Sequence, residues 1–437
     1  MKTKSCKHIQ EAIYFGPDEI RTCCQRYFSE GKIKGDATLI SVKDNKNTIS
    51  YEDIIAAKMS LIQKINADEE SDCKGCPHIE NKEWEKIEKS RIKLISIENH
   101  SLCNMKCTYC SPLYFGGVKP KYDIMKALDK ADVNNKELLV AWGGGEPTAR
   151  KDFGELFKKF YNNFLPKSQR VFTNGLLYSP ELQKAINESN CAITTSIDAG
   201  TEETFIKVRK SKGLRKVISN LERYSEERPE LVTIKYILTD DNYNIQELDE
   251  FVNLMANSNL LRSHFLISTD FKDEALSEAK IFSGLYLYCR LLSKNVNALN
   301  MDDHFFNRIE KSTSLFALLL ELNEKYGNSN QWIEQLGKNL QRFNLNNVVI
   351  WGSGQQCRLI LNRIQEQSES NFDVKAIIDA NPSRWGQKIN GYDIISPEAI
   401  PPKANIIIGS SNYYSDIYQQ IISQKIEPTR IIPNIFV

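Results

Sequence analysis

The sequence predicts an α/β protein: a partial (β/α)6 barrel with a Cys-rich N-terminal extension and a small C-terminal Rossmann-like α/β domain. Six apolar, β-branched stretches with amphipathic segments between them predict βα repeats and a parallel sheet. Polar and glycine-rich residues follow directly after these stretches, at the sheet edge where βα barrels place their active sites. A chain of 437 residues is too long for one ordinary domain, so several are expected.

The overall composition is that of a globular protein with balanced charge. Apolar residues make up 41% of the chain and charged residues 26%, and the formal net charge is +1. No global basic field is present to attract nucleic acid or an anionic membrane. The first residues lack the apolar stretch of a signal peptide, and no run approaches the roughly 18 apolar residues of a membrane span. We therefore expect a cytoplasmic protein without a nucleic-acid or membrane partner.

Residues 1–91 form the first predicted part, and cysteines are its main feature. Eight of the eleven cysteines precede residue 111, and disulfides are not expected because the cytosol keeps thiols reduced. Four thiolates are available here if one of the two adjacent cysteines is counted: Cys6, Cys23 or Cys24, Cys73 and Cys76. Four thiolates suffice for a closed metal site, either an iron–sulfur cluster or a structural zinc ion, and free thiols are the remaining alternative. We take Cys23 as the candidate ligand, although the sequence does not decide between the two neighbours.

A helix is predicted between the early and the late thiols of this part. Ser50 resembles a helix N-cap, with the acid Asp53 at the third position. Ile55, Met59 and Ile62 then form an apolar stripe at helical spacing. This helix separates the two groups of thiols along the chain and could bring the ends of the segment together.

The barrel is expected over residues 92–310. Its predicted strands are residues 92–97, 137–142, 170–173, 191–197, 232–238 and 264–268. Because parallel strands place their carboxyl ends at one edge, the residues that follow these strands should gather on one face of the barrel.

The loop after the first barrel strand carries three cysteines. Cys103, Cys107 and Cys110 are spaced four and three apart, so a compact loop can direct three thiolates at one centre, and thiolates are the usual ligands of iron–sulfur clusters. Three ligands are one too few for a cubane of four irons, so one iron would stay open to a small molecule, as a catalytic zinc keeps an open position. A zinc site is the alternative, but it would normally take a fourth Cys or His nearby, and only His100 lies just upstream.

The spacing of these cysteines, with the aromatic Tyr109 before the last one, resembles the signature of the radical S-adenosylmethionine (SAM) superfamily. The resemblance implies a [4Fe-4S] cluster whose open iron is chelated by the amino and carboxylate groups of SAM. One electron, from a donor such as flavodoxin or ferredoxin, then cleaves SAM to methionine and a 5′-deoxyadenosyl radical that abstracts hydrogen from the substrate. The partial barrel is the fold of this superfamily.

Downstream residues match the family in the expected order. Gly144, Gly145, Glu146 and Pro147 follow the second strand and are similar to the family's Gly-Gly-Glu-Pro motif, which receives the methionine amino group of SAM. Because glycine has no Cβ, such a turn also exposes its backbone to the close approach of a ligand.

Polar residues at the ends of the next strands are further SAM contacts that the resemblance implies. Ser196, Asn174 and Asp198 would contact the ribose and methionine portions of SAM, and Arg209 would meet its carboxylate. Structural alternatives are a turn at Asn174, helix capping by Asp198 and a solvated helix end at Arg209. No substrate acid or base is singled out, since the cofactor abstracts the hydrogen and the protein supplies position and water exclusion.

The N-terminal cysteines also have a counterpart in this superfamily. Many relatives carry an auxiliary cluster in a Cys-rich extension called SPASM or twitch, and residues 1–91 resemble such a segment. That extension usually follows the barrel, whereas here it precedes the barrel. The expectation for Cys6, Cys23, Cys73 and Cys76 is a second [4Fe-4S] cluster or a zinc ion.

A helical linker over residues 311–345 and a Rossmann-like domain over residues 346–437 complete the predicted organisation. In the last part a strand, a glycine turn and a helix start are followed by a strand that ends in Asp379, which is the opening of a Rossmann-like βαβ unit. Cys357 replaces the third glycine of the nucleotide-binding pattern. Structural docking, substrate presentation and nucleotide binding therefore all stay open for this domain.

Three functions are compatible with these observations. The first is a radical SAM enzyme that acts on a metabolite or carrier-linked substrate, such as a nucleotide-activated sugar recognised partly by the C-terminal domain. The second is a radical SAM enzyme that modifies a peptide. The third, from another class, is a non-catalytic scaffold or binding protein stabilised by zinc.

Overall fold

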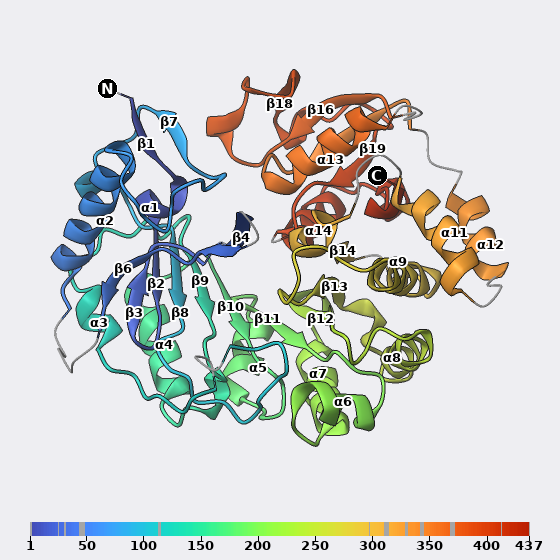
Figure 1. Ribbon diagram of the computed structural model, residues 1–437, viewed down its shortest axis with the longest axis horizontal. Helices are drawn as coiled ribbons and strands as arrows, with labels where there is room; N and C mark the ends of the chain where they lie inside the picture. Colours follow the sequence, from blue (N-terminus) through green and yellow to red (C-terminus); the bar gives the residue numbers. More distant parts are fainter. Residues whose placement is uncertain are drawn as a thin grey trace. The chain divides into compact units, whose positions relative to one another are not determined.

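The computed structural model describes residues 2–24, 26–29, 32–42, 49–111, 115–296, 298–309, 314–327, 331–340, 345–367, 372–411 and 413–436. The chain divides into two compact units, Met1–Thr195 with Arg209–Ser211 and Ser196–Val208 with Lys212–Val437. Each unit contains part of the predicted barrel, so the four-part division of the chain stays a prediction. Figure 1 shows both units with their strands and helices labelled.

Four predicted barrel strands are neighbours in the first unit. They are β8 (Leu94–Ile97), β9 (Leu139–Trp142), β10 (Ser168–Phe172) and β11 (Cys191–Ser196). Each is parallel to the next along the chain, in the order that βα repeats predict. This arrangement confirms the predicted fold class in this unit.

The N-terminal segment extends the same sheet, which the sequence did not predict. Strand β2 (Ala12–Phe15) pairs with β8 in parallel, β3 (Glu19–Arg21) pairs with β2 antiparallel, and β6 (Thr38–Ser41) pairs with β3 antiparallel. Two further antiparallel pairs join β1 (Thr3–Ser5) to β7 (Glu80–Lys82) and β4 (Arg26–Ser29) to β5 (Lys32–Gly35). The Cys-rich segment is therefore anchored in the barrel sheet through β2.

Helix α2 (Tyr51–Asn66) is the helix predicted between the thiols, and it begins at the predicted cap. The Ser50 hydroxyl accepts the Asp53 N–H, and the Asp53 carboxylate accepts the Ser50 N–H in return. Its buried face is shifted by one residue from the predicted stripe of Ile55, Met59 and Ile62. That face consists of Ile54, Lys58, Leu61 and Ile65, while Met59 is exposed. The prediction was wrong because it used apolar residues alone, whereas one position of the buried face is occupied by Lys58.

The other helices of the first unit are α1 (Lys7–Glu11), α3 (Ile124–Ala127), α4 (Phe153–Phe164) and α5 (Pro180–Asn187). Helix α4 covers the sheet through aromatic contacts, since Trp142 on β9 packs against Phe153, Phe157 and Phe160 at 5.4–5.9 Å between ring centroids. Helix α5 is capped by Ser179, whose hydroxyl accepts the Leu182 N–H, and Pro180 is its first residue.

The second unit contains the remaining barrel strands. Strand β12 (Val232–Leu238) pairs in parallel with β13 (His264–Thr269), and β13 pairs in parallel with β14 (Leu299–Met301), a strand that was not predicted. The helices between them and after them are α6 (Glu202–Arg209), α7 (Leu214–Ser225), α8 (Ile245–Asn257), α9 (Glu278–Ser293) and α10 (Asp303–Phe306). The predicted linker forms two helices, α11 (Leu315–Tyr326) and α12 (Gln331–Leu340).

The C-terminal part has the strand order of a Rossmann-like half. Strand β15 (Val348–Trp351) lies between β16 (Val374–Ile378) and β19 (Asn405–Ile408), and β18 (Tyr392–Ile395) lies beyond β16, all of them parallel. Strand β17 (Lys388–Ile389) is an antiparallel edge. Helices α13 (Gln355–Glu366) and α14 (Tyr414–Ser423) follow β15 and β19. After β15 the chain adds β16 and β18 on one side and then β19 on the other, so the strand order reverses at β15, as it does at the ligand-binding switch point of doubly wound sheets.

This domain packs against barrel elements of its own unit. The Gln356 side chain, in the first turn of α13, donates to the Met301 carbonyl at the end of β14 at 3.0 Å. The His264 ring on β13 stacks on Tyr414 at 5.3 Å with an interplanar angle of 9°. The buried Arg363 donates to the Ile309 carbonyl at 3.2 Å. The glycine turn before α13 therefore lies beside the carboxyl end of β14.

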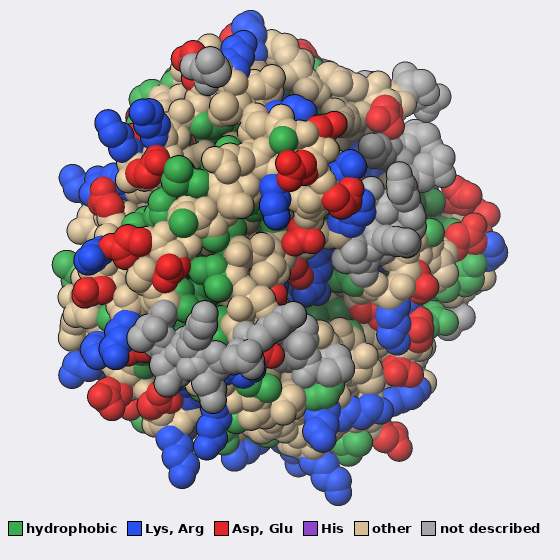
Figure 2. Space-filling model, turned by 60° about the vertical axis from the view of Figure 1, so that its left-hand side comes forward, with side chains coloured by type: hydrophobic (Ala, Val, Ile, Leu, Met, Phe, Trp, Pro, Cys, Tyr) green, Lys and Arg blue, Asp and Glu red, His purple; other side chains and the backbone are tan. Residues whose placement is uncertain are grey.

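The surface agrees with the balanced composition. On the face shown in Figure 2, Lys and Arg side chains are interspersed with Asp and Glu side chains. Among the described residues, no helix combines the length and the apolar character needed to cross a bilayer.

Candidate active site

The three cysteines after β8 lie in one compact loop. The Cys110 N–H donates to the Cys107 carbonyl at 3.0 Å, which closes a turn, and the Met105 N–H donates to the Cys103 sulfur at 3.4 Å. Burial, together with the neighbouring thiols of Cys107 and Cys103, raises the pKa of the Cys110 thiol to about 12. Three thiols that act on one another in this way would be stabilised as thiolates by a shared cationic centre.

One ring nitrogen of His100 is already engaged by the backbone of this loop. Its ring Nδ1 accepts the Leu102 N–H at 3.3 Å, and the ring is buried. Burial lowers the pKa of His100 to about 4, with the Arg150 charge as a second cause. This contact disfavours His100 as the fourth ligand of a zinc site.

The glycines of the Gly-Gly-Glu-Pro turn allow the cysteine loop itself to approach. A Cβ on Gly145 would lie 2.2 Å from the Leu102 carbonyl oxygen, and a Cβ on Gly144, whose φ is +85°, would lie 2.8 Å from the backbone of Glu98. The Gly145 N–H donates to the His100 carbonyl at 3.0 Å and the Glu146 N–H donates to the Leu102 carbonyl at 2.7 Å. The turn is therefore fixed to the chain that leads into Cys103, a reason for glycine that the sequence did not suggest.

Glu146 links this turn to the end of β10. Its Oε1 accepts the Thr173 hydroxyl at 2.8 Å and the Thr148 hydroxyl at 2.6 Å, and its Oε2 accepts the Asn174 N–H at 2.6 Å. The side chain is 2% exposed, and burial raises its pKa, although these donors act in the opposite direction. A carboxylate held by this many donors is fixed in position. Pro147 follows it as the first residue of a short 3-10 helix.

Asn174 combines a turn with a contact to the cysteine loop. Its Oδ1 accepts the Leu176 N–H at 3.0 Å, which is the turn predicted as the structural alternative. Its Nδ2 donates to Asn104 Oδ1 at 2.6 Å and lies 4.0 Å from the Cys103 sulfur. Asn174 therefore does both: it forms the turn and it reaches the three-cysteine site.

Tyr109 and Arg209 meet in the structure although they are 100 residues apart in the sequence. The Arg209 guanidinium donates to the Tyr109 hydroxyl and lies 5.7 Å from the ring centroid. Arg209 is 5% exposed, so the prediction of a solvated helix end was wrong. Its charge also lowers the pKa of Cys103 and Cys110 against their larger burial effects. A buried cation thus lies within electrostatic range of the Cys103 and Cys110 thiols.

Ser196 and Asp198 belong to the second unit. Ser196 ends β11 and is half-buried. Asp198 is fully buried with φ of +60°, and its Oδ1 accepts the Ile237 N–H at 2.7 Å. The following helix is capped by Thr201, whose hydroxyl accepts the Thr204 N–H at 3.2 Å, and not by Asp198. Asp198 therefore fixes the neighbouring strand, while its role toward SAM stays a prediction.

The four N-terminal thiols predicted as ligands share one neighbourhood. Cys6 and Cys73 are buried in an apolar cluster with Ile9, Leu61 and Ile65, and Cys23 packs against this cluster. Burial raises the pKa of Cys73 to about 12, with further contributions from Cys23, Cys6 and Cys76. The Cys6 sulfur also accepts a backbone hydrogen bond, from the Ile9 N–H at 3.5 Å. These cysteines thus act on one another electrostatically, while their role as metal ligands stays a prediction.

Cys24 faces another environment. Its thiol is hydrogen-bonded to the Tyr14 hydroxyl and is acted on by the Glu98 carboxylate. Cys23, in contrast, acts on Cys6, Cys73 and Cys76. The structure therefore favours Cys23 over Cys24 as the candidate ligand.

As the side chains stand, no group of three or more His, Cys, Asp or Glu in the described part is arranged to hold a metal ion. A single zinc ion needs its ligands at about 2.0–2.3 Å from one point, whereas a cubane cluster is larger and is bound through separate irons. In both sites the thiols thus lie in one neighbourhood, but they are not arranged around the position of a single ion.

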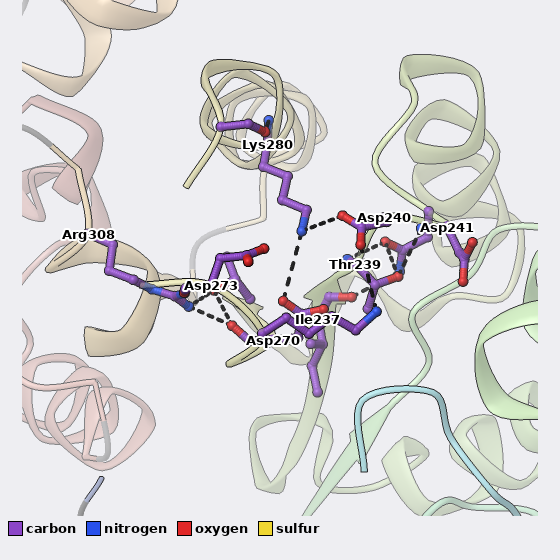
Figure 3. A network of polar contacts seen from close by, with 12 residues as sticks. Ile237, Thr239, Asp240, Asp241, Asp270, Asp273, Lys280 and Arg308 are labelled. Carbon is purple, nitrogen blue, oxygen red and sulfur yellow. Dashed lines mark hydrogen bonds and ion pairs between the residues drawn. The ribbon is translucent and has the colours of Figure 1, made fainter. Parts of the chain in front are cut away.

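A polar network at the carboxyl ends of β12 and β13 was missed from the sequence (Figure 3). Lys280 on α9 lies 2.7 Å from Asp240 Oδ1 and 3.9 Å from Asp270 Oδ1. Arg308 donates to the carbonyl oxygens of Asp270 and Asp273 at 2.7 Å each, which fixes the loop after β13. Burial raises the pKa of Asp270, and its Oδ2 is buried without a hydrogen-bond partner within the described part. The only sequence signal was an acid after each strand.

The predicted nucleotide-contacting acid of the C-terminal domain is already engaged. Asp379 accepts the Ser353 hydroxyl and N–H through Oδ2 and the Asn381 N–H at 2.8 Å through Oδ1. Arg384 donates to the Ser353 hydroxyl at 2.7 Å. Cys357 is buried, and its Cβ would lie 3.2 Å from a Cβ on Gly409, so it packs between helix and strand.

Comparisons with known families assign two stretches of the chain. Residues 100–255 match the radical SAM superfamily, and residues 344–432 match the family described as C2185-like, N-terminal. The first stretch contains the cysteine loop, the Gly-Gly-Glu-Pro turn, Asn174 and Arg209.

Similar proteins share only part of the chain. The molybdenum cofactor biosynthesis protein moc-5 of Caenorhabditis elegans is 31% identical over 166 residues, covering 36% of this chain and 27% of its own length. The GTP 3',8-cyclase of Cronobacter sakazakii is 24% identical over 205 residues, covering 41% of this chain and 61% of its own length. The chain therefore spans less than two thirds of these curated relatives.

Solved structures that resemble the chain include SuiB of Streptococcus suis, at a TM-score of 0.38 and 15% identity, covering 60% of this chain and 58% of that one. Another is anSMEcpe with bound AdoMet and Cp18Cys peptide, at a TM-score of 0.38 and 18% identity, covering 52% of this chain and 65% of that one.

Proposed function

We propose that this chain, which carries a radical SAM domain over residues 100–255, is an enzyme that binds a [4Fe-4S] cluster at Cys103, Cys107 and Cys110 and cleaves SAM reductively. The observation that carries the proposal is the meeting of three thiols in one loop with buried polar side chains from later strands. Thiolates at these positions would leave one iron free, which is what an amino-acid ligand requires. When bound, the cluster supplies the electron that cleaves SAM to methionine and a 5′-deoxyadenosyl radical.

The protein's own residues would bind and orient SAM. Glu146 is an anchored carboxylate suited to an ammonium group, and the turn of Gly144, Gly145 and Pro147 holds it against the cysteine loop. The Arg209 guanidinium is suited to a carboxylate, and Tyr109 keeps it in place. Asn174 would add an amide group beside Cys103.

The second unit contains further residues that we propose as contacts of SAM or of the substrate. Ser196 and Asp198 are proposed from the family resemblance as contacts of SAM. The network of Asp240, Asp270 and Lys280 offers both charges at the carboxyl ends of two strands, where βα barrels bind substrates. A buried carboxylate oxygen without a partner is suited to a hydroxyl or ammonium donor.

We propose a metabolite or carrier-linked molecule as the substrate class, such as a nucleotide-activated sugar. The C-terminal domain supports this choice, because its glycine turn lies beside the end of β14. A group bound in that crevice would be presented toward barrel strands of the same unit. Modification of a peptide is the alternative, and it requires no use of this crevice.

The four N-terminal thiols would hold an auxiliary centre. We propose Cys6, Cys23, Cys73 and Cys76 as its ligands and a [4Fe-4S] cluster as its occupant, with zinc as the alternative. Four thiolates close all positions, so this centre would transfer electrons or stabilise the fold without binding SAM. A cytoplasmic location and a flavodoxin- or ferredoxin-like electron donor stay predictions.

The experiment is anaerobic reconstitution with iron and sulfide, followed by dithionite and SAM, with 5′-deoxyadenosine measured by chromatography. We expect a brown protein that forms 5′-deoxyadenosine and methionine in equal amounts. A colourless protein that binds zinc and yields no 5′-deoxyadenosine would favour the non-catalytic scaffold instead. Candidate nucleotide sugars and peptides, added in turn, would distinguish the substrate classes by stimulating SAM cleavage.

A further inference from the structure

Lys58 is a buried cation in an apolar helix face. It belongs to the same face of α2 as Ile54, Leu61 and Ile65, and its exposed fraction is 0%. Its Nζ has no hydrogen-bond partner within the described part of the chain. Lysine is almost never fully buried unless it is paired, and an unpaired ammonium in an apolar interior is costly.

The nearby carboxylate does not supply a dedicated partner. Glu11 acts on Lys58 electrostatically, but its Oε1 lies 3.1 Å from Lys93 Nζ and its Oε2 lies 4.0 Å from Lys7 Nζ. Among the described residues, Lys58 is therefore left without a counter-ion of its own. Burial lowers the pKa of Lys58 to about 7, against which Cys6 and Glu11 act weakly.

The other neighbour that acts on Lys58 is a thiol of the four-cysteine site. Cys6 lies within electrostatic reach of Lys58, and Leu61 and Ile65 of the same helix face pack in the apolar cluster that contains Cys6 and Cys73. The buried helix face that carries Lys58 thus packs against the cluster in which Cys6 and Cys73 lie. A metal group held by four thiolates carries a net charge of about −2, whether it is a zinc ion or an oxidised cubane.

We propose that Lys58 is the counter-cation of the four-cysteine site: its ammonium offsets the negative charge of the metal group and favours its retention and, for an iron–sulfur cluster, its reduction. This inference rests on the auxiliary centre proposed above, but not on the SAM-binding cluster. It explains why a lysine occupies a core position of α2. Surrounding charge is one of the properties that set the potential of such clusters.

The test is a cycle of variants. Lys58→Met removes the charge and keeps a long apolar chain, and Lys64→Met, at an exposed position of the same helix, is the matched control. Each is made in the parent and in a Cys73→Ala, Cys76→Ala background that lacks two of the four thiols. Metal content after reconstitution, the rate of metal loss to a chelator and the midpoint of thermal unfolding are measured.

If Lys58 is a counter-cation, Lys58→Met should destabilise the protein that holds the metal and stabilise the background that lacks two of the thiols. In the parent, Lys58→Met should accelerate metal loss from the four-cysteine site at least tenfold. If the centre is an iron–sulfur cluster, the ratio of reduced to oxidised cluster at a fixed potential should fall about tenfold, which is 59 mV for one electron. In the Cys73→Ala, Cys76→Ala background the same substitution should raise the unfolding midpoint, because it removes an unpaired buried charge.

Two results would overturn the inference. One is a Lys58→Met protein that retains metal like the parent and has an unfolding midpoint that shifts equally in both backgrounds, which would indicate a purely structural lysine. The other is a parent that holds no more metal than the Cys73→Ala, Cys76→Ala variant, which would remove the auxiliary centre as well. Formation of 5′-deoxyadenosine in the same preparations reports on the SAM-binding cluster separately, so the two proposals fail independently.

Discussion

The two cysteine sites of the first unit differ in what surrounds their thiols. The three-cysteine site is bordered by polar groups from distant parts of the chain, namely Arg209 and Asn174. In the four-cysteine site, Cys6 and Cys73 are buried in an apolar cluster, and the fully buried Lys58 lies on a helix face that packs against this cluster. A missing ligand together with convergent polar groups is suited to binding a small molecule, whereas a complete ligand set in an apolar shell is suited to holding a permanent centre.

The largest expected effect separates the two sites by function. Cys107→Ala removes one of only three cluster ligands, so it should abolish the formation of 5′-deoxyadenosine from SAM. Cys76→Ala should leave the SAM-binding cluster in place and lower the iron content. Iron analysis and anaerobic SAM-cleavage assays measure both. Equal iron in the Cys76→Ala variant and the parent would contradict an auxiliary iron–sulfur cluster.

The next prediction concerns the membership of the four-cysteine site. Cys23→Ala should lose the metal of that site, because the thiol of Cys23 acts on the other three. Cys24→Ala is the matched control at the adjacent position. It should keep the metal, since the Cys24 thiol of the parent is hydrogen-bonded to Tyr14. Metal content per chain distinguishes them. The reverse pattern would show that the two neighbours exchange roles on metal binding.

The third prediction tests how the three-cysteine loop is held. Gly145→Ala places a Cβ 2.2 Å from the Leu102 carbonyl oxygen and should lower the free energy of unfolding by about 1–3 kcal/mol, with loss of iron from the adjacent cluster. Gly143→Ala meets its nearest atom at 3.7 Å and should stay within about 0.5 kcal/mol of the parent. Denaturant unfolding and iron analysis measure this. Equal stability of both variants would show that the loop has room to move.

The smallest effect is expected at Arg209. Arg209→Lys keeps the charge but loses the planar fork that pairs with a carboxylate, so SAM binding should weaken about tenfold, equivalent to about 1.4 kcal/mol. Lys210→Met, at the exposed neighbouring position, should bind SAM like the parent. Anaerobic titration calorimetry measures the affinities. An unchanged affinity in Arg209→Lys would limit Arg209 to positioning Tyr109.

The sequence by itself determined the features that depend on near neighbours along the chain. The spacing of Cys103, Cys107 and Cys110 follows from one loop, and the capping of α2 by Ser50 and Asp53 follows from four residues. Six strands of the barrel, from β8 to β13, were also predictable, because a buried parallel strand forms a run of apolar residues in the sequence.

Only the tertiary structure decided the features that join distant segments. It brought Arg209 to Tyr109 and gave the adjacent residues Cys23 and Cys24 different surroundings. It also placed β2 beside β8 and buried Lys58 in an apolar helix face. It also showed that Gly145 makes room for the chain at Leu102. These features depend on contacts between segments that are far apart in the sequence. Such contacts are set by the fold, and they produce no periodic pattern of residues from which they could be predicted.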